Sequence, residues 1–219
     1  MALACTMRFM AMAIYRWCLF TAAALTDRDI GESFDQDADD VAGLLAHLGI
    51  GKANFLGFSN GGSTTLYIAK KYPQLVNKIV AASPLYKRDG VIAGMFDGLQ
   101  QATLADMPEA LKTGFLAVNP DKEKLQTMFN KDRERMLGFT DMPDSDLEAI
   151  TAPALLIVAD RDVITVEHLV KMCSLIPNAR LVVLPGTHGS YLGTVESDLL
   201  QSSRMPEISA ILIKEFLEI

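Results

Sequence analysis

The stretch Ala53-Asn54-Phe55-Leu56-Gly57-Phe58-Ser59-Asn60-Gly61 decides how this chain folds. Its first five residues, with Asn54 as the one polar side chain, predict a short buried strand, and residues 57–61 form the pattern G-x-S-x-G. A helix is predicted from Gly61 to Tyr72, where Pro73 closes it. A serine at such a strand-to-helix turn is held in a strained conformation, which is typical of an activated nucleophile. The alternative is a tight structural loop.

The residues on either side of Ser59 are expected to make room for the turn and to supply an oxyanion donor. We expect glycine at 57 and 61 because side chains there would clash with the neighbouring strand and helix. The turn also directs the first backbone N–H groups of the helix at the reacting centre. The N–H of Asn60 is therefore the predicted oxyanion donor, and the helix dipole favours the same charge.

From Ser33 onward, helix and strand signals alternate. Ser33 to Gln36 reads as a capping box, and the helix that it opens is expected to stop at Gly49. Later strands are predicted at 79–82, 154–158 and 180–184, with helices from about Val166 and from Pro206. This alternation predicts an α/β fold, a mostly parallel sheet flanked by helices.

Between about residues 87 and 150 the pattern contains only helical stretches, at 91–103, 108–118 and 122–137. We predict a helical lid inserted between two core strands of a single domain that spans 1–219. Large apolar residues on these helices either pack the lid's own core or line a pocket above Ser59. Met95 and Met128 are predicted substrate contacts on the second interpretation, together with Tyr191 from a loop.

A nucleophilic serine needs a base, and the chain has three histidines. His47 and His168 fall opposite the apolar residues of their helices, so we expect both to be solvated. His188 instead follows a predicted strand in a Pro-Gly-Thr-His-Gly-Ser loop. Parallel sheets bind their ligands at the carboxyl ends of strands, so His188 is the candidate base. A structural histidine in a glycine-rich turn is the alternative.

Two aspartates compete to orient that base. Asp160 and Asp162 both follow the strand at 154–159. Asp162 lies deeper in the loop and is favoured, whereas Asp160 is better placed to pair with Arg161 or to cap the turn. Asp89 is a distant third candidate.

Composition limits the class of protein. The 219 residues carry a formal net charge of −7, and half of them are hydrophobic, as in ordinary globular domains. We find no stripe of Lys and Arg, which excludes nucleic acid as a partner. The three cysteines, Cys5, Cys18 and Cys173, have no zinc-finger spacing, and their odd number indicates free thiols in a reducing, cytoplasmic setting.

Residues 1–25 are almost all apolar but are broken by Arg8 and Arg16. A signal peptide needs an uninterrupted apolar core, and a spanning helix needs about twenty residues with few charges. We therefore expect a buried strand or helix at the edge of the domain and no membrane association. A membrane anchor at 1–25 is a minor alternative.

The order Ser59, Asp162, His188, each after a strand, resembles the α/β-hydrolase family. Residues 153–162 look like that family's strand followed by G-x-x-D, with Ala159 in place of the glycine, and this spacing assigns the acid to Asp162. Residues 184–189 are similar to its histidine loop. The resemblance implies a serine hydrolase that cleaves an ester-like bond of a small molecule through an acyl-enzyme on Ser59, with no metal or organic cofactor.

The departure from the family lies upstream. Members usually have several more strands there and a His-Gly loop that supplies a second oxyanion donor, whereas this chain has about thirty residues before its first predicted helix. Arg28-x-x-Gly31-x-Ser33 is a weak match to a family turn. We hypothesise that residues 1–25 come from a mis-called start or a shifted reading frame. A missing strand would leave a sheet edge open to homo-oligomer formation.

Two alternative functions follow from the same residues. Without the second oxyanion donor, the chain is a catalytically impaired pseudo-hydrolase or binding protein. The other alternative is a hydrolase that uses the same triad to cleave a carbon–carbon bond.

Overall fold

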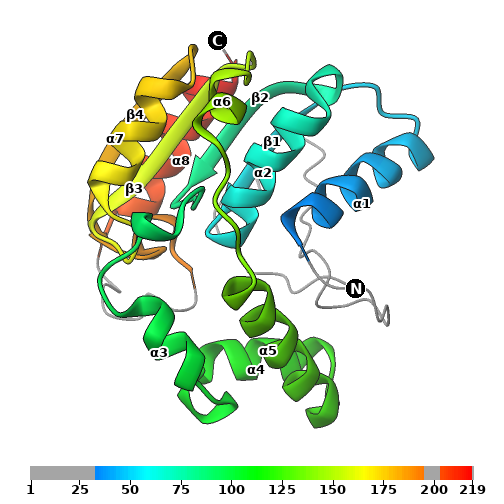
Figure 1. Ribbon diagram of the computed structural model, residues 1–219, viewed down its shortest axis with the longest axis vertical. Coiled ribbons are helices and arrows are strands. Elements are labelled where there is room, and N and C mark those ends of the chain that lie inside the picture. The colour runs from blue at the N-terminus through cyan, green and yellow to red at the C-terminus, as the bar shows by residue number, and fades with distance from the viewer. Residues whose placement is uncertain (1–32, 195–202, 219) are drawn as a thin grey trace.

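The computed structural model describes residues 33–194 and 203–218. Its centre is a sheet of four strands: β1 (Ala53–Phe58), β2 (Val76–Ala82), β3 (Ala154–Arg161) and β4 (Ala179–Thr187). The strands lie in chain order, and each neighbouring pair is parallel (Figure 1). The predicted α/β class with a parallel sheet is therefore confirmed, and β1 forms one edge of the described sheet.

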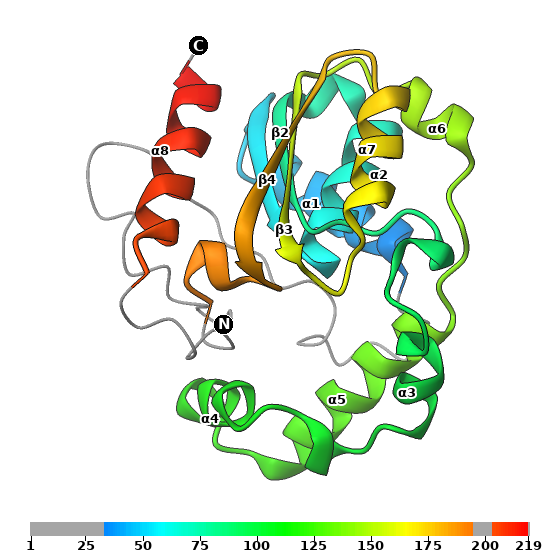
Figure 2. The same cartoon turned by 90° about the vertical axis from the view of Figure 1, so that its left-hand side faces the viewer.

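Helices cover both faces of this sheet. On one face lie α1 (Phe34–His47), α2 (Asn60–Lys71) and α7 (Val166–Leu175), and on the other lies α8 (Met205–Glu218), as Figure 2 shows. The helix α1 begins as predicted, because the Ser33 hydroxyl accepts the N–H of Gln36 at 3.2 Å.

The two faces divide the core into two layers. Ile79 and Ala81 of β2 pack into the cluster formed with α1, α2 and α7, whereas Val80 and Ala82 pack into the cluster formed with α8. All four are fully buried. Successive side chains of a strand point to opposite faces, so a strand covered on both sides reads as an unbroken apolar run.

Three helices form a cap between β2 and β3: α3 (Met95–Gln101), α4 (Glu109–Val118) and α5 (Lys122–Leu137). They lie together beyond the carboxyl ends of the strands (Figure 2). The short helix α6 (Asp144–Glu148) packs instead against α2 and α7, and its Leu147 is buried in the main core. The cap is therefore narrower than the segment 87–150 that the sequence predicts as a lid.

A buried ion pair ties the cap to the core. Arg135, near the end of α5, lies 3.4 Å from the carboxylate of Asp37 on α1, and both side chains are almost fully enclosed. The hydroxyl of Thr64 on α2 donates to the same carboxylate at 3.2 Å. The pair joins the end of α5 to α1, and removing one partner would be strongly destabilising because it leaves an uncompensated buried charge.

Predictions for residues 1–25, including Cys5 and Cys18, lie outside the described residues. Cys173 carries a free thiol. Among the helices within 33–194 and 203–218, none is both long and apolar enough to cross a membrane.

The prediction that His168 is solvated is wrong. Its side chain is buried, its ring stacks on Tyr86 at 4.5 Å, and its Nε2 accepts the backbone N–H of Tyr86 at 3.2 Å. Gly90 makes room for the ring, since a Cβ there would overlap it. The loop that follows β2 covers the supposed outer face of α7, and the period of one helix cannot reveal such a cover. His47 is exposed, as predicted.

This burial predicts a specific acid sensitivity. Loss of hydration lowers the pKa of His168 from 6.5 to about 4, so between these values the unfolded chain binds a proton that the folded chain resists. From pH 7 to pH 5 this group should remove about 2 kcal/mol of stability. His168→Gln, which retains an acceptor for Tyr86, should lose less stability over that interval in urea unfolding. Equal losses in both proteins would contradict this account.

Candidate active site

Ser59 directly follows β1 and has a backbone conformation that L-residues seldom adopt, with φ 55° and ψ −121°. Its N–H donates to the carbonyl of Ala82 on β2 at 2.8 Å, and its own carbonyl accepts the N–H of Ser63 at 3.0 Å. The sheet and the helix therefore hold the serine from both sides. Such strain persists only where the surroundings fix the residue, which is the property expected of a nucleophile turn.

The glycines of this turn are not equivalent. A Cβ on Gly57 would overlap the backbone of Gly61, and a Cβ on Gly62 would lie 2.8 Å from the carbonyl oxygen of Ala82. A Cβ on Gly61 would meet nothing within 4 Å. The predicted clash is therefore correct at Gly57 but wrong at Gly61, and the second close approach falls one residue later.

His188 and Asp162 reach the same place from the ends of β4 and β3. The Nε2 atom of His188 lies 3.1 Å from the Oγ of Ser59, and its Nδ1 lies 2.6 Å from the Oδ1 of Asp162. With the proton on Nδ1, the imidazole donates to the carboxylate and can accept the serine proton. The structure thus brings together the three residues that the sequence predicts, in the geometry of an activated nucleophile.

The carboxylate of Asp162 is fully enclosed and well supplied with donors. Its Oδ1 also accepts the N–H of Ile164 at 3.1 Å, and its Oδ2 accepts the hydroxyl of Ser83 at 2.6 Å and the N–H of Ala159 at 3.4 Å. Burial raises the pKa of Asp162, but the bonds from His188, Ser83 and Ile164 outweigh burial and hold this pKa below its ordinary value. The group is therefore a carboxylate near neutral pH.

Asp160 has a different contact. Its Oδ1 accepts the N–H of Gly186 at 2.8 Å and so fastens the loop that carries His188. The hydroxyl of Ser190 tightens the same loop by accepting the N–H of Thr187 at 2.8 Å. Of the two competing aspartates, Asp162 is thus the one bonded to the imidazole.

Asn60 is the first residue of α2, where backbone N–H groups have no partner within the helix. It directly follows Ser59, so this N–H lies at the positive end of the helix dipole beside the nucleophile. Its predicted role as oxyanion donor is compatible with this position.

The three predicted substrate contacts lie in different surroundings. Tyr191 is completely buried, with its hydroxyl 2.7 Å from that of Ser83, so its side chain does not face a substrate cleft. Met128 is buried in the cap's own core with Phe115 and Leu125, because α5 must bury its apolar stripe against its neighbours. Met95, in contrast, lines a pocket formed by residues that the structure describes.

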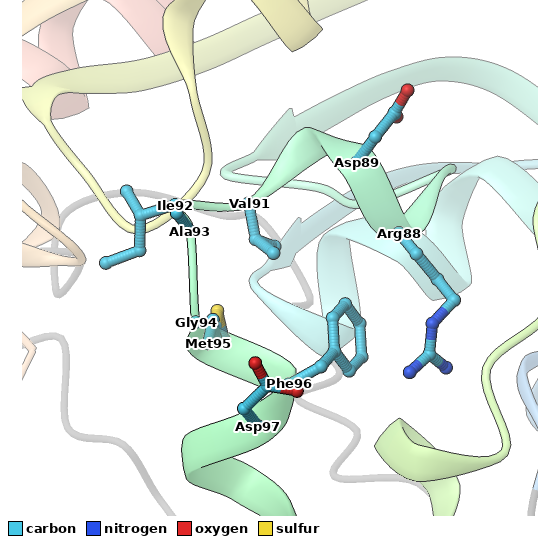
Figure 3. A pocket seen from close by; sticks show the side chains of 9 residues that line it. All are labelled: Arg88, Asp89, Val91, Ile92, Ala93, Gly94, Met95, Phe96 and Asp97. Carbon is cyan, nitrogen blue, oxygen red and sulfur yellow. The ribbon is translucent and has the colours of Figure 1, made fainter.

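That pocket is a hollow of about 220 Å³ where the chain leaves the sheet for the cap (Figure 3). Residues 88–89 and 91–97 line it, and the ring of Phe96 lies 3.8 Å from the guanidinium of Arg88. The N–H of Ile92 donates to the carbonyl of Val163 at 2.9 Å. One wall of the hollow therefore adjoins the loop of Asp162.

Ser83 is a site residue that the sequence reasoning missed. It directly follows β2, just as Ser59, Asp162 and His188 directly follow the other three strands. Position at a strand end was the signal that could have found it. Within the described ranges, no group of three or more His, Cys, Asp or Glu side chains is arranged to hold a metal ion.

Comparison with known proteins places the chain in a family. A family model described as "alpha/beta hydrolase fold" matches residues 20–117. The non-heme haloperoxidase of Rhodococcus erythropolis is 30% identical over 204 residues, which cover 78% of this chain and 74% of that protein. The chain belongs to the α/β-hydrolase family. It is an enzyme of the hydrolase class, as the motif resemblance predicts.

Two further proteins are similar to this chain, one in sequence and one in fold alone. The bifunctional esterase/perhydrolase DCH of Acinetobacter calcoaceticus is 28% identical over 205 residues, with 78% of this chain and 74% of that protein covered. The structure of the meta-cleavage product hydrolase CumD from Pseudomonas fluorescens IP01 aligns with a TM-score of 0.64 at 22% identity. That alignment covers 89% of this chain and 75% of CumD and shows a shared fold.

The turn around Ser59 yields a prediction with a matched control. Gly57→Ala should destabilise the protein by about 3 kcal/mol or more and abolish activity, because its Cβ meets backbone that cannot move aside. Gly61→Ala should leave the free energy of unfolding nearly unchanged, since its Cβ enters open space. Urea unfolding of both variants is the measurement, and a Gly61→Ala variant as unstable as Gly57→Ala would contradict the geometry.

Proposed function

We propose that this α/β-hydrolase is a serine hydrolase that cleaves an ester-like bond of a small molecule through an acyl-enzyme on Ser59. The observation that carries the proposal is the continuous chain from Ser59 through His188 to the buried Asp162, with separations of 3.1 and 2.6 Å. An ester-cleaving activity also agrees with the name of the Acinetobacter relative, an esterase/perhydrolase.

In this mechanism the Oγ of Ser59 attacks the carbonyl carbon while Nε2 of His188 takes the serine proton. The carboxylate of Asp162 stabilises the resulting imidazolium, and the N–H of Asn60 donates to the oxyanion. His188 then protonates the leaving alcohol, and the carbon–oxygen bond breaks to leave the acyl group on Ser59. A water molecule, deprotonated by His188, attacks the acyl carbon, and the proton returns to Ser59 as the acid leaves.

The hollow lined by Met95 supplies a candidate site for the acyl or alcohol part of the substrate. Apolar groups such as Val91, Ile92 and Phe96 form much of its wall beside the cap, and it adjoins the loop of Asp162. Ligand sites of this kind combine apolar walls with a few polar groups. We therefore propose Met95, and not Met128 or Tyr191, as a substrate contact.

The choice of acid gives the test of the proposed function. Asp162→Asn should lower kcat/KM for p-nitrophenyl acetate by orders of magnitude, about 10⁴-fold in the best-studied triad, because the imidazole loses its productive tautomer. Asp160→Asn keeps an oxygen that accepts from Gly186 and should change kcat/KM by about threefold or less.

Both variants should stay folded by circular dichroism. If Asp160→Asn were the more damaging change, the acid would be Asp160. If the unaltered protein turned over the ester no faster than Asp162→Asn, the pseudo-hydrolase alternative would replace the proposal.

A further inference from the structure

Ser83 has a strained backbone that the triad itself does not explain. Its φ is 48°, and Ser59 is the only other described residue besides glycine with a positive φ. The N–H of Ser83 donates to the carbonyl of Ile157 at 2.7 Å, so the neighbouring strand fixes its main chain. Strain of this kind collects at functional sites, where it aims a side chain. The side chain of Ser83 is buried, which excludes it as a nucleophile.

The hydrogen bonds of Ser83 run in one direction. Its hydroxyl donates to Oδ2 of Asp162 at 2.6 Å, because an ionised carboxylate can only accept. A hydroxyl has one proton, so in the 2.7 Å contact between Ser83 and Tyr191 the tyrosine must be the donor. Burial raises the pKa of Tyr191, which keeps this proton in place. The chain of donors therefore runs from Tyr191 to Ser83 to Asp162.

This series of hydrogen bonds ends at Oδ2 of Asp162, the carboxylate oxygen that His188 does not contact. Besides Ser83, the described donor to Oδ2 is the N–H of Ala159, at the long distance of 3.4 Å. Without Ser83 the carboxylate would lose its short bond on that side and could rotate about its terminal torsion, which has a broad preference. Tyr191 lies three residues after His188. The same series of hydrogen bonds therefore links the loop that carries His188 to the end of β2.

We propose that Ser83 and Tyr191 form a positioning pair that orients the Asp162 carboxylate and thereby sets the efficiency of His188 as a base. The pair acts through Asp162 and touches no substrate, since both side chains are enclosed. The inference rests on the proposed function, in which His188 must be held in one tautomer and orientation.

A double-mutant cycle with ester turnover separates positioning from packing. Ser83→Ala should lower kcat about tenfold and leave KM unchanged, as loss of a hydrogen bond to a charged group implies. Tyr191→Phe, which keeps the ring, should lower kcat about threefold. In the Asp162→Asn background, Ser83→Ala should have almost no further effect, because the group through which it acts is already lost.

Two buried residues outside the network serve as controls. Ser209→Ala on α8 and Tyr86→Phe beside His168 remove hydroxyls of the same kinds from enclosed positions and should leave kcat unchanged. Equal effects of Ser83→Ala with and without Asp162→Asn would overturn the proposal, since a packing defect is additive.

A second readout does not depend on turnover. The Nδ1 proton of His188, in its 2.6 Å bond to Asp162, should give a far-downfield proton resonance. Ser83→Ala should shift or broaden this signal, and Ser209→Ala should not. A signal unchanged in Ser83→Ala would overturn the positioning pair, even in an active enzyme. A signal that changes in a protein without ester turnover would support the pair and reject the proposed function instead.

Discussion

The carboxylate of Asp162 is a buried negative charge, and the arrangement of the site depends on satisfying it. A carboxylate enclosed without donors would be costly by several kcal/mol or would take up a proton. Here the donors come from three strand ends: Ser83 after β2, Ile164 in the loop after β3 and His188 after β4. The loops must therefore converge on one point at the carboxyl edge of the sheet. The other ring nitrogen of His188 lies within hydrogen-bond distance of Ser59, which follows β1.

The parallel sheet makes this convergence possible without long loops. Strands that run in one direction end on the same edge, so a residue placed directly after each strand lies beside its counterparts. At two of the four strand ends, hydrogen bonds of the backbone also fix the residue that follows the strand. Ser59 and Ser83 donate their N–H groups to carbonyls on the neighbouring strands, and both adopt a positive φ. Ladder bonds thus fix side chains that in ordinary loops would sample several directions.

Much of this could be predicted from the sequence because its signals are local. The apolar runs identify the four strands, and the strand-to-helix pattern around Ser59 identifies the turn. What failed depends on contacts between distant segments. The period of α7 places His168 on an outer face, but the loop after β2 covers that face. The pattern G-x-S-x-G marks Gly61 as constrained, whereas the close approach to β2 falls on Gly62. Ser83 belongs to no motif of fixed spacing.

The cap illustrates the same limit. An apolar stripe on a helix shows that something must cover it but not which partner does so. Met95 and Met128 have the same residue type and the same kind of helix, yet one lines a hollow and the other packs against Phe115. Likewise, absence of strands between 87 and 150 does not reveal that α6 returns to the main core. Such distinctions require the path of the chain in space.

The central claim is that Ser59 is a nucleophile activated by His188. Reaction with a fluorophosphonate, followed by mass spectrometry of the digested protein, tests it most directly, because the reagent bonds to activated serines. The account predicts one adduct, located on Ser59, that is absent in Ser59→Ala and formed far more slowly in His188→Ala. Labelling that survives both substitutions, or that falls on another residue, would contradict it.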